Sequence, residues 1–231
     1  MAYLSYIERY PLASFAVFFI AVPLILAWIR YTHLDKAFRL LFVFLILDLV
    51  VGLWMLHLAA HRANNILLLN LFVPFRFILF SGMFYYNFRS LAIKRVIFYT
   101  LIAFIPFALL DIYASNRNLE DLHNHLVGRY SQVVESALII LWVLLYFFEI
   151  INTLKVSNIL TYPFFWVCAG LLIYYSGNIF YFPFWHYADK WENNLRLGWI
   201  EDIPYIVELI SLFLFSVGIW QIRSHHDRIQ S

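Results

Sequence analysis

Residues 40–60 read LLFVFLILDLVVGLWMLHLAA, an apolar run in which Asp48 and His57 are the charged and titratable exceptions. A helix needs about 20 mostly apolar residues to cross the hydrocarbon core of a bilayer. This run meets that length, and six other stretches of the chain do so as well. The sequence predicts spans at about 12–30, 37–60, 65–88, 96–115, 130–151, 162–184 and 203–222. We therefore predict an all-α integral membrane protein, with residues 1–231 forming a single domain, a bundle of seven transmembrane helices.

The composition excludes several other classes of protein. Hydrophobic residues make up 64% of the chain and charged residues 13%, and the mean hydropathy is +0.76. A soluble domain carries about 25% charged residues. The net charge of +2 comes from loop residues without a basic patch, so no nucleic-acid partner is expected. Cys168 is the only cysteine, which excludes intramolecular disulfides and CxxC motifs.

Loop lysines and arginines predict the orientation, because these residues are enriched on the cytoplasmic side. Nine fall on one side: Arg30, Lys36, Arg39, Arg89, Lys94, Arg95, Lys155, Arg223 and Arg228. Six fall on the other: Arg9, Arg62, Arg117, Arg129, Lys190 and Arg196. The N-terminus is therefore predicted outside and the C-terminus in the cytoplasm. The chain has no N-x-[ST] sequon, which favours a bacterial inner membrane.

Two short sequence echoes indicate a weak internal repeat. Residues 63–65 and 192–194 both end in two asparagines, and Leu-Phe-Ser recurs at 79–81 and 214–216. These echoes fit three helices, a connecting helix and three further helices.

Charged side chains inside the predicted spans are the main candidates for function. Such groups are costly in hydrocarbon and nearly always face protein or a water-filled cavity. Helical spacing places Arg76, Glu135 and Glu208 on polar stripes of the third, fifth and seventh spans, and Asn178 and Tyr174 share one face of the sixth span. We predict an outward-facing polar cavity with these ligand-binding residues: Arg76, Glu135, Glu208, Asn178 and Tyr174. Two interpretations of Arg76 stay open, a structural Arg–Glu clamp and a contact with an anionic ligand.

The second span carries two further candidates. Asp48 lies nine residues before His57, about half a turn around a straight helix, so both cannot face one cavity unless Gly52 bends the helix. We interpret Asp48 and Gly52 as part of a close helix-packing face. His57 and His61 are i,i+4 neighbours, a spacing at which two imidazoles can hold one Zn²⁺, with Asp111, Glu135 or Glu208 completing the shell. The alternative is a hydrogen-bonding pair near the membrane interface.

Known seven-span families are excluded by their own motifs. The last span has no lysine for a retinal Schiff base, and no DRY-like or NPxxY-like motif is present. The small sugar transporters share the helix plan but carry a Pro-Gln motif that is absent here. The zinc hydrolases of the alkaline-ceramidase type carry histidines in their last span, and this chain does not.

Three functions therefore stay open. The first is a sensor or accessory subunit that binds a small molecule or lipid; its tail after Arg223 is short, so it would signal through a cytoplasmic or membrane partner. The second is a transporter of small solutes, with a site at mid-membrane. The third is a metal-dependent membrane hydrolase that uses the outer histidines.

Overall fold

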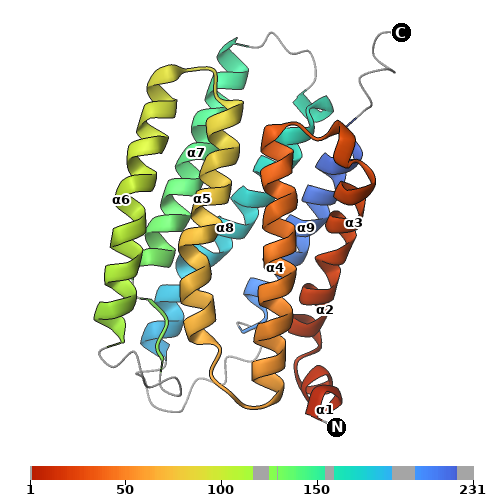
Figure 1. Ribbon diagram of the computed structural model, residues 1–231, viewed down its shortest axis with the longest axis vertical. Helices are drawn as coiled ribbons and strands as arrows, with labels where there is room; N and C mark the ends of the chain where they lie inside the picture. Colours follow the sequence, from red (N-terminus) through yellow and green to blue (C-terminus); the bar gives the residue numbers. More distant parts are fainter. Residues whose placement is uncertain (1, 117–124, 129, 154–158, 189–200, 223–231) are drawn as a thin grey trace.

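The chain was analysed as a computed structural model that describes residues 2–116, 125–128, 130–153, 159–188 and 201–222, without the side chains of 182 and 184–188. Within these residues all regular secondary structure is helical (Figure 1). The helices are α1 (Ala2–Arg9), α2 (Pro11–Phe19), α3 (Ala21–Ile29), η1 (Tyr31–His33), α4 (Lys36–Ala60), α5 (Ile66–Asn87), α6 (Leu91–Ser115), α7 (Ser131–Thr153), η2 (Ile159–Thr161), α8 (Pro163–Ala188) and α9 (Ile203–Trp220).

The seven predicted spans are confirmed as helices long and apolar enough to cross a bilayer. Most predicted bounds agree within two residues. The fourth helix begins five residues earlier than predicted, because Ser90 caps it by accepting a hydrogen bond from the Ile93 amide at 3.4 Å. The predicted repeat is untested, since residues 192–194 lie outside the described residues.

The first span is divided into α2 and α3 at Ile20. Pro23 explains this break, because a proline inside a helix lacks an amide hydrogen and its ring clashes with the carbonyl four residues earlier, here that of Phe19. The short helix α1 precedes this span and was not predicted. It packs beside α4 and α2.

Helix α5 forms the centre of the bundle (Figure 1). It packs on α4, α6 and α7, and 56% of its most apolar stretch is buried, the largest fraction among the spans. Phe77, Phe80 and Phe84 supply fully buried rings on this helix. Helix α8 packs most extensively on α9, and α9 also contacts α2 and α3, so the first and last spans lie side by side.

Two acidic side chains connect neighbouring helices at opposite ends of the bundle. Oδ2 of Asp111 on α6 accepts hydrogen bonds from the amides of Tyr130 at 3.0 Å and Ser131 at 2.8 Å, where α7 begins. At the other end, Oε1 of Glu149 on α7 accepts a hydrogen bond from the amide of Ser90, the residue before α6, at 3.0 Å. Amides at a helix start lack partners within the helix, and a carboxylate there also complements the helix dipole. Both acids therefore have a structural role.

Large apolar side chains cover the outside of the described bundle. Trp28 and Ile29 are 71% exposed and Phe180 is 78% exposed. In water such a surface would be unstable, whereas lipid tails cover it without cost. The protein is therefore an integral membrane protein embedded in a lipid bilayer.

Gly218 sets the close approach of α9 to α8. A Cβ atom at this position would lie 2.7 Å from the carbonyl oxygen of Pro163, a backbone atom. Gly218→Ala is therefore expected to lower the free energy of unfolding by about 1–3 kcal/mol, measured by unfolding in detergent micelles. Gly52→Ala is the matched control. Its Cβ would lie 3.3 Å from a side-chain carbon of Val17, which can shift by a few tenths of an ångström, so the loss should be smaller. An equal or larger loss for Gly52→Ala would contradict this account of the interface.

Candidate functional site

Arg76 and Glu135 form a buried, bidentate ion pair between α5 and α7. Nε of Arg76 donates to Oε1 of Glu135 at 2.8 Å, and Nη2 donates to Oε2 at 2.5 Å. Arg76 is 6% exposed and Glu135 is fully buried. This fork-to-fork geometry is the strongest pairing available to an arginine and a carboxylate. The interpretation of Arg76 as part of an Arg–Glu clamp is thus the one that the geometry favours.

Two adjacent tyrosines of α8 extend the ion pair. Nη1 of Arg76 donates to the hydroxyl of Tyr174 at 2.9 Å, and the hydroxyl of Tyr175 donates to Oε1 of Glu135 at 2.8 Å. The guanidinium carbon also lies 5.5 and 5.7 Å from the two ring centroids, within the range of cation–π attraction. All three kinds of nitrogen on Arg76 are therefore engaged by other helices.

A pocket opens beside this ion pair, between α4, α5, α8 and α9. The space inside it that the centre of a water molecule can occupy is about 20 Å³, and all the empty space is about 330 Å³ when the part open to the outside is counted. The lining side chains are Phe44, Asp48, Arg76, Phe80, Leu171, Tyr174, Glu208, Ser211, Leu212 and Phe215. Asp48 is the central residue of α4, and Arg76 is near the centre of α5. The pocket therefore lies at the middle depth of the bundle.

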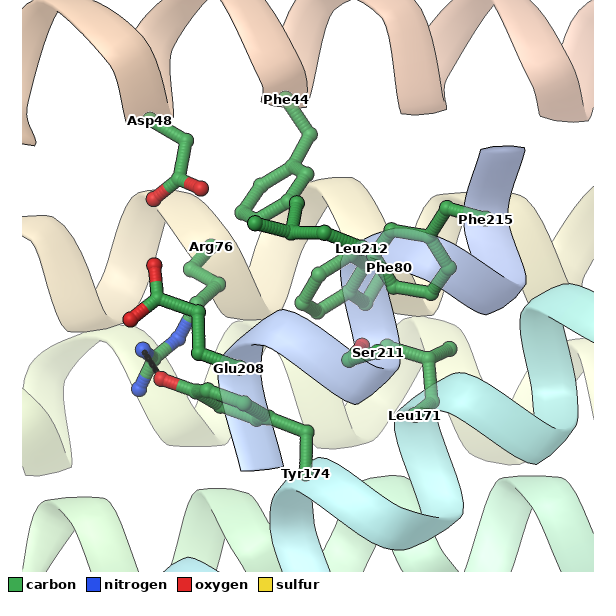
Figure 2. A pocket seen from close by; sticks show the side chains of 10 residues that line it. All are labelled: Phe44, Asp48, Arg76, Phe80, Leu171, Tyr174, Glu208, Ser211, Leu212 and Phe215. Atoms are coloured by element: carbon green, nitrogen blue, oxygen red, sulfur yellow. Dashed lines mark hydrogen bonds between the residues drawn. The ribbon is translucent and has the colours of Figure 1, made fainter. Parts of the chain in front are cut away.

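Figure 2 shows the carboxylates of Asp48 and Glu208 pointing toward one another from α4 and α9, next to Arg76. Both residues are half-buried. Among the described residues, the Arg76–Glu135 pair is the one salt bridge within 4.0 Å, so neither carboxylate has a cationic side chain as its direct partner. The pocket thus holds two carboxylates beside an arginine that a third carboxylate already neutralises.

The other half of the pocket is apolar. Phe44, Phe80, Phe215 and two leucines line the side away from the carboxylates (Figure 2). The ring centroids of Phe44 and Phe80 lie 4.4 Å apart. Between the two halves lies Ser211, which is 3% exposed. Its hydroxyl, unlike that of Ser216 on the same helix, is not seen to bond to the carbonyl four residues earlier.

The structure therefore brings four of the five predicted ligand-binding residues together: Arg76, Glu135, Tyr174 and Glu208. Glu135 contacts Arg76 but does not line the pocket, whereas the other three do. Asn178 is buried one turn beyond Tyr174, where its Nδ2 donates to the Tyr174 carbonyl at 3.0 Å and its Oδ1 is unpaired among the described residues. Whether any of these residues binds a ligand stays a prediction.

His57 and His61 lie apart from this pocket, at the N-terminal end of the bundle, and both are exposed. Nδ1 of His57 is 2.6 Å from the Tyr3 hydroxyl of α1, and Nδ1 of His61 is 2.8 Å from the His57 carbonyl oxygen. Zinc sites need three or four ligands. The described part of the chain contains no group of three His, Cys, Asp or Glu side chains that would hold a metal. Asp111 and Glu135, proposed above to complete the shell, are engaged by Ser131 and Arg76 instead.

Two polar residues of the pocket, Asp48 and Ser211, were not among the predicted ligand-binding residues. Asp48 was assigned to a packing face, but it lines the pocket, and Gly52 alone makes the close approach, to Val17 of α2. The signal for Asp48 was its charge at the centre of a span. Helical spacing places Ser211 on the same stripe as Glu208, but a serine is a weaker signal than a charge because serines are common at helix contacts in membranes.

The chain matches no protein-family model, no curated protein and no solved structure. The argument for its function therefore depends on the geometry of the pocket and on the surface of the bundle.

Proposed function

We propose that this protein is a membrane sensor or accessory subunit that binds a small molecule or lipid in the mid-membrane pocket. The observation that carries the proposal is the pair of facing carboxylates, Asp48 and Glu208, which have no ion-pair partner among the described residues. Charged groups at this depth are retained when they serve a ligand or a coupling step, because their insertion is costly. A structural role is already filled by Arg76 and Glu135.

The distribution of basic residues supports the predicted orientation. The whole sequence has nine such residues on the predicted inner side and six on the outer side. The described ones at the end of the bundle where α3 and α5 finish are Arg30, Lys36, Arg39, Arg89, Lys94 and Arg95. At this end, Arg30 stacks on Trp220 at 4.7 Å and Lys36 on Tyr86 at 5.5 Å. Such pairs are typical of membrane interfaces. We propose that this end faces the cytoplasm and that the pocket opens toward the other side.

We propose that the response passes to a partner protein in the cytoplasm or the membrane. The basic cytoplasmic surface around Arg89, Lys94 and Arg95 is the proposed contact. The membrane we propose is a bacterial inner membrane.

A second candidate is a transporter of small solutes. The central depth of the pocket favours it, because secondary transporters hold their substrate near the bilayer midplane. The metal-dependent hydrolase has no comparable support among the described residues, since His57 and His61 lack a third ligand.

Labelling of Ser211→Cys separates the two leading functions. In intact cells, a sensor is expected to react with membrane-impermeant thiol reagents from the outer side alone. A transporter is expected to react from both sides as its pocket alternates. Cys168, the one cysteine of the chain, is fully buried in the apolar core, so Cys168→Ala provides a background without native thiols and without a buried hydroxyl.

Arg9→Cys and Arg95→Cys serve as orientation controls, since both positions are exposed and lie at opposite ends of the bundle. Arg9→Cys should react from outside and Arg95→Cys should not. Leu171→Cys, at a second position in the pocket wall, replaces Ser211→Cys if that variant does not fold. Reaction of neither pocket cysteine from either side would contradict the proposed binding function.

A further inference from the structure

We infer that the ligand of this pocket is a small organic cation, an ammonium group that carries a short apolar substituent. This inference depends on the proposed binding function and adds the chemical class of the ligand to it. Neither a bare inorganic cation nor an anion matches both halves of the pocket.

The acidic half of the pocket suits a positively charged partner. Arg76 is neutralised by Glu135 through two hydrogen bonds, which leaves Asp48 and Glu208 facing each other. Two ionised carboxylates in surroundings of low dielectric repel one another strongly. An ammonium group between them relieves that repulsion and supplies hydrogen-bond donors to both.

An anionic ligand is disfavoured by the same geometry. Arg76 is the one cationic side chain in the described lining. Its Nε and Nη2 donate to Glu135 and its Nη1 to Tyr174. An anion would have to displace Glu135 from a buried bidentate pair and would also meet Asp48 and Glu208.

The apolar half of the pocket specifies a ligand with a hydrocarbon part. Phe44, Phe80 and Phe215 contribute aromatic faces directly beside the acidic half (Figure 2). Aromatic faces attract ammonium groups, and they also cover alkyl groups favourably. A hydrated metal ion would gain nothing from these rings.

Ser211 adds a hydroxyl group to the wall of the pocket. The residue is 3% exposed and lines the pocket where the acidic and apolar halves meet. A serine inside a helix often bonds to the carbonyl four residues earlier, as Ser216 does on the same helix with Leu212 at 2.8 Å. Ser211 does not, so its oxygen is available to accept a hydrogen bond from an ammonium group.

Thermal unfolding of the full chain in detergent micelles tests the inference with defined probes. Butylammonium chloride is compared with butanol, sodium butyrate, ammonium chloride and sodium chloride at matched concentration and ionic strength. A ligand that binds the folded state raises the midpoint of unfolding in a saturable way. We expect butylammonium to raise it by several degrees, and each of the other four compounds to have a much smaller effect.

Variants assign the effect to the pocket. Asp48→Asn and Glu208→Gln should each weaken the apparent affinity for butylammonium about tenfold or more, since each removes a charged hydrogen-bond acceptor. Phe44→Leu should weaken it severalfold through the loss of an aromatic face. Glu8→Gln, which changes an exposed acid of α1, is the matched control and should bind as the parent does.

Two results would overturn the inference. Equal stabilisation by sodium or ammonium chloride would show an inorganic cation site, and equal stabilisation by butanol or butyrate would show that charge is not recognised. If the acidic variants do not fold, protection of Ser211→Cys from thiol reagents by butylammonium, but not by butanol, replaces them. Protection of this cysteine by a neutral or anionic compound alone would reject the organic cation and leave the binding function standing. A pocket cysteine that reacts with no reagent would reject both.

Discussion

Glu135→Gln is expected to lower the free energy of unfolding by about 3–5 kcal/mol, the cost of leaving one partner of a buried ion pair unpaired. Glu135 is fully buried and receives three hydrogen bonds, two from Arg76 and one from Tyr175. The glutamine keeps the shape of the side chain but leaves the guanidinium without a carboxylate. Denaturant unfolding in detergent micelles, followed by tryptophan fluorescence, measures the loss.

Glu208→Gln is the matched control, because it is the same substitution at a second acid of the bundle interior. Glu208 is half-buried and has no ion-pair partner among the described residues. Its removal relieves repulsion with Asp48, so the free energy of unfolding should change by less than about 1 kcal/mol, and an increase is the expected sign. Ligand response should be lost in this variant although its stability is retained.

Neutralising both members of the pair should restore much of the lost stability. A buried ion pair replaced as a whole by neutral groups often costs little, in contrast to the removal of one partner. The double variant Arg76→Met/Glu135→Gln should therefore have a larger free energy of unfolding than Glu135→Gln alone. A double-mutant cycle quantifies the coupling between the two residues. Equal losses for Glu135→Gln and Glu208→Gln would contradict the division into a structural pair and a functional pair.

Asp111→Ala is expected to be the second most damaging change, at about 2–3 kcal/mol. Its carboxylate accepts from the amides of Tyr130 and Ser131, and those amides begin α7 and have no partner in the first turn. Asp111→Asn should recover about half of the loss, because the amide oxygen still accepts but carries no charge.

Hydrogen exchange distinguishes this local role from a general loss of stability. In Asp111→Ala, the amides at the start of α7 should exchange faster, while those at the contact of α8 with α9 should change little. Uniform acceleration throughout the bundle would show that Asp111 acts on the whole fold and not on the start of α7.

The fold was predictable because each span carries its own signal. The length of an apolar run and the cost of an unpaired backbone in lipid require a helix at each of these places, whatever its neighbours. The break at Ile20 follows equally from one local residue, Pro23. The early start of α6 and the existence of α1 were missed, because short polar segments beside a span lack this signal.

The candidate site was predictable in part. Arg76, Glu135 and Glu208 were identified by the cost of charge in a membrane, and this cost is a property of each residue alone. Their pairing was not predictable. Helical spacing places a side chain on a face of its own helix but does not say which other helix lies opposite. The pocket position of Asp48 was not predicted for this reason, since Glu208, which lines the pocket with it, lies 160 positions later in the chain.

The sequence by itself thus determined the class of protein, the seven spans and the set of intramembrane charges, because hydrophobic length and desolvation act within single helices. Only the tertiary structure decided which charges neutralise each other and which stay available. The packing of α5 on α7 pairs Arg76 with Glu135, and the return of α9 to the first helices brings Glu208 opposite Asp48. Both outcomes depend on contacts between distant segments, which the spacing of residues along one helix does not encode.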